Sequence, residues 1–209
     1  MSKRTAGGTS RPSKISERSR ASTQRQRNKV VAIAVDGRKT ENDYFKGWKR
    51  KLGNCGIVIK PMYVNSGGNP YKAVTELSSK ISHDRDFDEL WCVCDIDGAS
   101  HENVEKARAL AKRIGAELIL SDRCFEIWIA LHWERISLNK ICCEKDAVDL
   151  VCKHYTEYSS VNKTVTFSTL YDRTSTAIAN ATWLEKQNCQ NPSTNVHNLV
   201  ERIMKLSEK

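Results

Sequence analysis

The sequence predicts an α/β fold, in which a mainly parallel β-sheet is flanked by helices and followed by a helical C-terminal part. Three observations support this prediction. Short apolar runs rich in β-branched residues alternate with helical patterns between residues 29 and 120. Several of these runs end at Gly or Asp-Gly turn signals. Farther along the chain the patterns become helical, and 39% hydrophobic residues in a chain of 209 can form a substantial core.

The first unit is a strand, a tight turn and a helix. The strand is predicted at residues 29–35 and stops at Asp36-Gly37. Thr40 offers an N-cap hydroxyl for the helix that follows. Glu41 and Asp43 place negative charge in its first turn, where the helix dipole favours it. Apolar residues then recur at helical spacing until a glycine ends the pattern.

The next units repeat this order of strand and helix. Asn69 is predicted to cap a helix that begins at Pro70, and Gly115 is predicted to end another helix. Crossovers of this kind join neighbouring parallel strands. The expected elements are strands at 56–64, 90–94 and 116–120, and helices at 70–82 and 102–114.

Helical patterns dominate after Cys124. They recur at 146–158 and 176–185, and Asn191-Pro192-Ser193-Thr194 is predicted to start the last helix. We therefore expect three regions: a disordered basic tail at 1–28, an α/β core at 29–135, and a helical C-terminal region at 136–209 packed on the core.

The net charge of +9 is concentrated in the N-terminal tail. Residues 1–28 hold eight Lys and Arg against one acid, Glu17, so the tail carries +7 and the rest of the chain about +2. The tail is also rich in Ser, Thr and Gly, which predicts disorder. Such a tail is either an electrostatic arm for a polyanion or a solubilising leader.

Eight cysteines raise the questions of disulfides and zinc. The N-terminus has no signal-peptide pattern, and no apolar run approaches the length of a membrane span, so we expect a cytoplasmic protein with reduced thiols. Cys142, Cys143, Cys152 and His154 form the one cluster worth testing as a metal site. Their spacing matches no common zinc pattern.

Acidic residues follow two of the predicted strands. Asp36 ends the first strand and Asp95 the third, with Asp97 two residues further in a DxDG sequence. The carboxyl ends of parallel strands form the ligand-binding edge of an open sheet, so these acids meet if the two strands are neighbours. Residues two apart on an extended backbone also share a face. Three such carboxylates repel one another unless a cation neutralises them, and hard oxygen ligands suit Mg²⁺ or Mn²⁺. The alternative is that DxDG is only a local turn.

Four segments resemble the RloB-like family. Residues 35–45 are similar to its EGxxTExxYF opening, and Asp95-Ile96-Asp97 resembles its DxD strand end. Residues 124–132, with Asp122-Arg123 before them, are similar to its NPCFExWxxxH segment, and residues 191–194 resemble its NPST motif. The resemblance spans about residues 29–205.

RloB-like proteins are related to Toprim enzymes, which use one Glu and a DxD pair to bind Mg²⁺ for phosphodiester cleavage or transfer. The resemblance therefore implies a Toprim-like core with Asp36, Asp95 and Asp97 as catalytic and metal-binding residues. It also implies a role in bacterial antiphage or abortive-infection loci, often beside an AAA/ABC-type ATPase. Two departures stand out: Asp36 is one methylene shorter than the usual Glu, and Asp122-Arg123 replaces Asn-Pro.

Glu126 is the remaining catalytic and metal-binding candidate. Asp122 lies four residues before it, so on a continuous helix the two would share a face, although Asp122 is better explained as a helix cap. A charge between Phe125 and Ile127 is costly unless it is paired. Glu126 is therefore either an active-site ligand or a buried structural partner.

Three residues are candidates for substrate binding. Arg38 and Lys39 follow the first acid at a helix N-terminus, a natural place for phosphate, or else they are solvated loop charges. His132 belongs to the family segment, but its separation of six residues from Glu126 does not align the two on one helical face, and a structural histidine is the alternative. Nothing in the sequence distinguishes Lys140 or Lys163 from the other lysines.

These observations predict a nuclease that hydrolyses RNA or DNA phosphodiesters with Mg²⁺ or Mn²⁺ and acts as an effector of antiphage defence. The expected partners are nucleic acid and an AAA/ABC-type ATPase, without a membrane, and the sequence is compatible with a homo-oligomer. One alternative is a catalytically weakened nucleic-acid-binding or sensor subunit. Another is a phosphatase or phosphotransferase for a small molecule, although the DxDG lies on the third strand and not the first.

Overall fold

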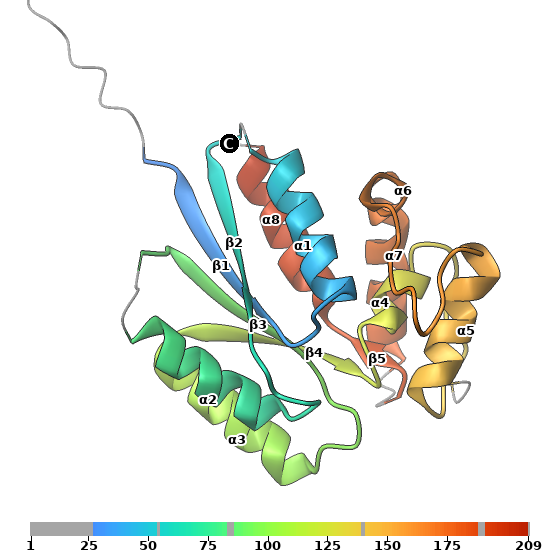
Figure 1. The fold of residues 1–209 in the computed structure, drawn as a ribbon, viewed down its shortest axis with the longest axis horizontal. Coiled ribbons are helices and arrows are strands. Elements are labelled where there is room, and N and C mark those ends of the chain that lie inside the picture. The colour runs from blue at the N-terminus through green and yellow to red at the C-terminus, as the bar shows by residue number, and fades with distance from the viewer. Residues whose placement is uncertain (1–26, 54, 83–85, 139–140, 188–190, 209) are drawn as a thin grey trace, which may run out of the picture.

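The computed structural model describes residues 27–53, 55–82, 86–138, 141–187 and 191–208. Its centre is a five-stranded sheet with the strand order β2-β1-β3-β4-β5, which confirms the predicted α/β class (Figure 1). Four strands are parallel and the short β5 is antiparallel to β4. The strands are β1 Lys29–Val35, β2 Ile57–Tyr63, β3 Glu89–Asp95, β4 Ala116–Asp122 and β5 Ser193–Thr194.

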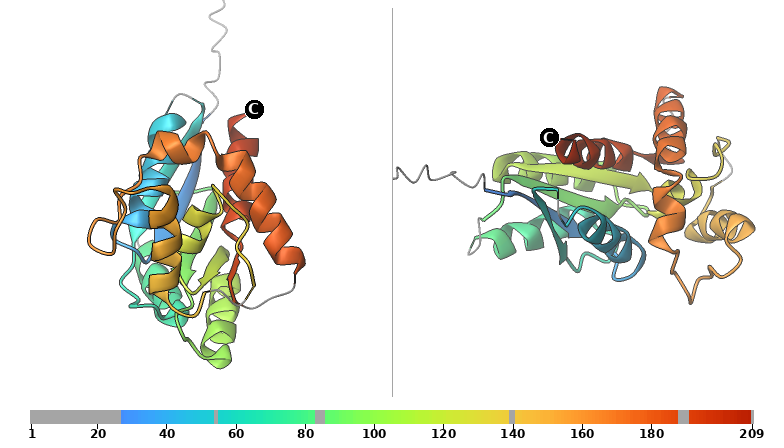
Figure 2. Two further views of the ribbon diagram at one scale, coloured as in Figure 1. Left: turned by 90° about the vertical axis from the view of Figure 1, so that its right-hand side faces the viewer. Right: turned by 90° about the horizontal axis from the view of Figure 1, so that it is seen from above.

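The helices cover both faces of the sheet and one of its ends. Helices α2 and α3 pack together on one face, while α1 and α8 cover the other (Figure 1). Figure 2 shows α4 to α7 gathered beyond the carboxyl ends of the strands. The helices are α1 Thr40–Lys51, α2 Pro70–Ile81, α3 His101–Ile114, α4 Glu126–Ala130, α5 Glu144–His154, α6 Phe167–Tyr171, α7 Thr174–Lys186 and α8 Val196–Ser207.

Strand β1 shows why both faces of the sheet are covered. Its side chains alternate between the two faces, and Val31, Ile33 and Val35 enter the core shared with α1 and α8. Ala32 and Ala34 face α2 and α3. All five are at most 1% exposed, which explains the continuous apolar run in the sequence.

One hydrophobic core joins the α/β part to the C-terminal helices. It contains side chains from β1 and α1 together with side chains from α4, α5, α7 and α8. A group of aromatic rings, including Tyr44, Trp48, Phe125 and Trp128, lies where α1 meets α4. The sequence boundary near residue 135 therefore does not divide two separate cores.

Three predictions about where helices start are wrong. Thr40 is the first residue of α1 and not its N-cap, since Lys39 occupies that position. Asp122 ends β4 and pairs with Ser193, so it neither caps α4 nor continues into it. Ser193-Thr194 adds a strand to the sheet, and the last helix begins only at Val196.

Two predicted helix ends are confirmed. The side chain of Asn69 accepts a hydrogen bond from the backbone N–H of Lys72, and Gly115 ends α3 with a φ of 73°. The predicted tail at 1–28 lies outside the described residues except for Arg27 and Asn28. Within the described ranges, no helix combines the length and apolar character required to cross a bilayer.

Candidate functional site

The candidate site lies at the carboxyl ends of the neighbouring strands β1 and β3, where the sheet switches the side toward which its crossovers lead. From β1 the chain crosses to β2 on one side, whereas from β3 it crosses to β4 on the other. Val35 pairs with Val93, and the backbone N–H of Asp36 donates to the carbonyl of Val93 at 3.3 Å. The two strands that end in Asp36 and Asp95 are therefore neighbours, as the sequence prediction required. In open α/β sheets this switch point is the usual place for a ligand.

Asp36 is held by the loop that follows β2. Its carboxylate accepts hydrogen bonds from the backbone N–H of Ser66 at 2.9 Å and of Gly68 at 3.2 Å, and a short one from the Ser66 hydroxyl. Gly68 has a φ of 75°, and a Cβ built there would lie 3.8 Å from Oδ2 of Asp97. The same glycine therefore lies between Asp36 and the DxD turn.

Glu41 folds back toward Asp36. Its carboxylate occupies the space beside Gly37, where an added Cβ would lie only 1.6 Å from Oε2 of Glu41. Glu41 is 7% exposed, and burial raises its pKa to about 7. Its own backbone N–H opposes this rise, and the charges of Glu126 and Asp36 add to it. Glu41 lies in the first turn of α1, as predicted, but its carboxyl group is also buried near Asp36 and Glu126.

Asp95 belongs to the same group of acids. Its pKa lies well above the ordinary value because of burial first, and then because of the charges of Glu41, Glu126 and Asp36. The carboxyl groups of Asp36, Glu41 and Glu126 therefore lie close enough to Asp95 to raise its pKa, and we call these four residues the acid cluster. They come from three segments of the chain: the turn from β1 into α1, the end of β3, and the start of α4.

Asp97 lies apart from its DxD partner. Strand β3 ends at Asp95, and Asp97 has a φ of 23°, so the extended backbone that was expected to put both side chains on one face stops too early. Asp97 is exposed and stands beside Gly68 and Asp122. The pKa of Asp122 is raised by burial, lowered by Arg123, and raised by Asp97.

Glu126 is the first residue of α4, and its carboxylate is buried. Its Oε1 accepts a hydrogen bond from the Tyr158 hydroxyl at 2.7 Å and lies 3.2 Å from Nζ of Lys163. The Thr40 hydroxyl also donates to it, at 3.4 Å. Although burial opposes the charge, Lys163 and the Tyr158 hydroxyl hold the pKa of Glu126 below its ordinary value.

Residues 31–203 match the family model described as RloB-like protein. The chain belongs to the RloB-like family. No curated protein and no solved structure gives a significant match. In this RloB-like chain the acid cluster draws on three of the resembling segments: the opening motif with Asp36 and Glu41, the DxD strand end, and the segment that contains Glu126.

Lys163 is the residue near the acid cluster that the sequence could not select. Its ammonium group lies between Glu126 and Glu144, at 3.2 Å and 2.5 Å from their Oε1 atoms. Burial opposes the charge of Lys163, but these two carboxylates raise its pKa above the ordinary value. Lys163 comes from a polar segment without periodicity, so only the three-dimensional fold brings it to the site.

The two predicted cationic substrate residues lie at the edge of the acid cluster. Arg38 is exposed, donates from Nε to the Tyr63 hydroxyl at 3.1 Å, and lies over the Tyr63 ring. Lys39 is also exposed, with Nζ 3.4 Å from the carbonyl of Val161. Both side chains are exposed, and their role in binding a substrate phosphate stays a prediction.

The structure corrects the prediction for His132. This side chain is 0% exposed, and its ring lies against Tyr44, Trp128 and Trp133. Its Nδ1 lies 3.0 Å from the carbonyl of Trp128, and burial lowers its pKa to about 4. His132 is a neutral histidine of the aromatic core and does not contact a substrate in this conformation.

No preassembled metal site is present in the described part of the RloB-like chain. There, no three His, Cys, Asp or Glu side chains are arranged as a group that could hold a metal ion. In the acid cluster, Asp36 accepts a hydrogen bond from Ser66, and Glu126 is paired with Tyr158 and Lys163. The cysteine cluster is also separated: Cys152 donates to the carbonyl of Tyr158, and His154 pairs with Glu134.

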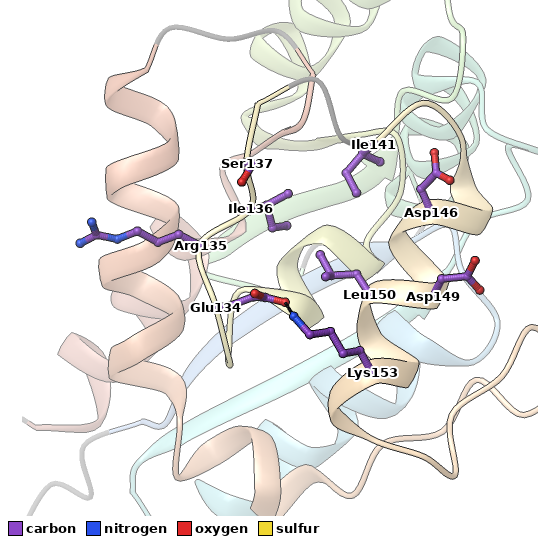
Figure 3. Close-up of a pocket in the computed structure, with 9 residues that line it drawn as sticks. All are labelled: Glu134, Arg135, Ile136, Ser137, Ile141, Asp146, Asp149, Leu150 and Lys153. Atoms are coloured by element: carbon purple, nitrogen blue, oxygen red, sulfur yellow. Dashed lines mark hydrogen bonds and ion pairs between the residues drawn. The ribbon is translucent and has the colours of Figure 1, made fainter.

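A cavity of about 310 Å³ lies between α5 and the segment that follows α4 (Figure 3). Ile136, Ile141 and Leu150 point into it, and the ion pair between Glu134 and Lys153 lies at one end. None of the residues that line it belongs to the acid cluster. The cavity is therefore separate from the candidate catalytic site.

Proposed function

We propose that this RloB-like protein is a metal-dependent nuclease that hydrolyses phosphodiesters of RNA or DNA. One observation carries the proposal: the carboxyl groups of Asp36, Glu41 and Glu126 lie near Asp95 at the switch point of the sheet, where their charges add to burial in raising the pKa of Asp95. Structural acids rarely gather in this way, because buried like charges repel one another. Groups with perturbed pKa values at a ligand-binding edge are typical of active sites.

The donor set suits a hard divalent cation. Asp36, Asp95 and Glu126, with Asp97 at the edge and Glu41 as an addition from the structure, would hold Mg²⁺ or Mn²⁺ through carboxylate oxygens. When bound, such an ion supplies charge stabilisation to a phosphate and lowers the pKa of a water. Asp36 would exchange its hydrogen bonds to Ser66 and Gly68 for this role.

The other residues of the site match phosphodiester chemistry. Lys163 offers an ammonium group beside Glu126, where it can stabilise negative charge on a phosphate. Arg38 and Lys39 can orient the flanking phosphates at the start of α1.

The family resemblance also suggests a biological role and a partner for this protein. RloB-like proteins are associated with antiphage and abortive-infection loci, often beside an AAA/ABC-type ATPase, and we propose the same role and partner here. A Toprim-like mechanism and a cytoplasmic location belong to this proposal. The second candidate is a sensor subunit with weakened catalysis, which the engagement of Asp36 by Ser66 and Gly68 favours.

Cleavage of mixed RNA and DNA substrates tests the proposal, with Mg²⁺, with Mn²⁺ and with EDTA. We expect cleavage that needs a divalent ion and is lost in Asp95→Asn. Asp149→Asn is the matched control, because Asp149 is exposed on α5 and pairs with Lys145. Cleavage that persists in Asp95→Asn would overturn the site. No cleavage with any ion or with the ATPase partner would favour the sensor.

A further inference from the structure

A second pocket lies at the far end of α1, away from the acid cluster. The last turn of α1 and the helix α6 border an open pocket of about 450 Å³, which is within the range of roughly 300–1,000 Å³ for small-ligand sites. We call it the α1–α6 pocket. It is lined by Gly47, Arg50, Lys51, Thr166, Phe167, Ser168, Tyr171 and Asp172.

Aromatic rings form one wall of this pocket and are held in place. Phe167 packs directly on Gly47, where an added Cβ would lie 2.1 Å from the ring. The ring of Tyr171 meets Trp48 edge to face, with 5.4 Å between their centroids. Phe167 and Tyr171 remain partly exposed, so they offer apolar ring surface to a ligand.

Cations and hydroxyl groups complete the lining. Nζ of Lys51 lies 4.3 Å from the centroid of the Tyr171 ring, and Arg50 stands beside it. The two cations outnumber the one acid of the lining, Asp172. Thr166 and Ser168 are exposed and add hydroxyl groups. An aromatic surface with adjacent cations is the combination that binds unpaired nucleobases together with their phosphates.

The chain connects this pocket directly to the acid cluster. Helix α1 begins at Thr40, whose hydroxyl contacts Glu126 and the carbonyl of Lys163, and it ends at Lys51. At ~1.5 Å per residue the two ends are ~16 Å apart, or about five stacked nucleotides at ~3.4 Å each. The helix carries acids in its first turn and only basic charges in its last, namely Lys49, Arg50 and Lys51.

We propose that the α1–α6 pocket binds an unpaired nucleobase and its phosphate, on the same strand whose phosphodiester reaches the acid cluster. The inference rests on the proposed nuclease function and narrows its substrate to nucleic acid with a single-stranded segment. A nucleotide fits this lining because Arg50 and Lys51 can pair with its phosphate and the partly exposed rings of Phe167 and Tyr171 can stack on its base. A duplex would present no free base to Tyr171.

Binding without catalysis tests this pocket separately from the nuclease function. Fluorescence anisotropy in EDTA measures the affinity of the full chain for a short labelled single-stranded RNA or DNA and for the matching duplex. We expect the single strand to bind more tightly. Tyr171→Leu should weaken its binding at least about fivefold, whereas Tyr171→Phe should bind like the wild type. Lys51→Gln should weaken binding and reduce its salt dependence by about one phosphate contact, and Lys145→Gln should not.

The outcomes distinguish the two proposals. Asp95→Asn should lose cleavage but still bind the single strand in EDTA. If cleavage survives Asp95→Asn, the nuclease site is wrong, whatever the pocket does. If Tyr171→Leu and Lys51→Gln bind the single strand as tightly as the wild type, or if the duplex binds equally well, the pocket proposal is overturned. A wild-type chain that binds neither form overturns it as well.

Discussion

Glu41→Gln tests the electrostatics of the acid cluster with the smallest change in shape. The side chain of Glu41 is nearly buried, and its pKa of about 7 stands above the ordinary value of 4.5. The difference between the two pKa values corresponds to about 3 kcal/mol of folding stability that depends on protonation of Glu41, because one pKa unit is worth about 1.4 kcal/mol. Since the folded state has the higher pKa, this stability is fully present below pH 4.5 and is lost as the pH rises through 7.

The glutamine variant cannot lose stability in this way. Without divalent ions, its unfolding free energy relative to the wild type should increase by about 2–3 kcal/mol between about pH 5 and pH 8. Urea unfolding followed by tryptophan fluorescence in EDTA measures the difference, with Glu117→Gln on the exposed side of β4 as control. Saturating Mg²⁺ should stabilise the wild type more than Glu41→Gln. A difference that stays within about 0.5 kcal/mol over this pH range would refute the reasoning.

Three further substitutions probe other parts of the account. Lys163→Met leaves the Glu126 carboxylate buried without its cation and should lower the unfolding free energy by about 1–3 kcal/mol. This is less than for a fully buried pair, because Lys163 is 26% exposed. Lys145→Met, from an exposed ion pair, is the control and should leave the unfolding free energy unchanged in the same denaturation assay. The pKa of His132 in the folded state, about 4, lies below the ordinary 6.5, so the wild type loses up to about 3 kcal/mol of stability as the pH falls from 6.5 to 4. His132→Phe should remove this loss. Equal loss of stability in the two proteins over this pH range would contradict the prediction. Gly47→Ala should displace Phe167 and lower the unfolding free energy by about 1–3 kcal/mol. Gly53→Ala should leave it unchanged, because the nearest atom to an added Cβ is 3.6 Å away. Equal melting temperatures of the two variants would argue against the contact between Gly47 and Phe167.

The parts of the fold that follow from the sequence are those with a local physical cause. The buried strands are recognisable in the sequence as apolar runs. Asn69 marks the start of α2 through the hydrogen bond of its side chain, and Gly115 marks the end of α3 through its left-handed backbone conformation. The meeting of Asp36 and Asp95 follows from the alternation of strands and helices once β1 and β3 are neighbours. Strand β5 escaped prediction because two residues are too short to give a pattern.

The site residues that were missed depend on distant parts of the chain. In the sequence, Glu41 has the position of an ordinary charge at a helix start. Only the structure shows that its carboxylate occupies the space beside Gly37, where any side chain would clash. Lys163 comes from an irregular segment far from Glu126 in sequence, and no spacing rule joins the two. The opposite error, for His132, came from placing weight on a family segment although the helical spacing already pointed away from Glu126.

Crystals soaked in Mn²⁺ and measured by anomalous scattering test the central claim directly. The account predicts a Mn²⁺ peak between the ends of β1 and β3, bound by carboxylate oxygens of the acid cluster, and the loss of that peak in Asp95→Asn. A strong peak elsewhere, with Asp36 still hydrogen-bonded to Ser66 and Gly68 and the acid cluster empty, would contradict it.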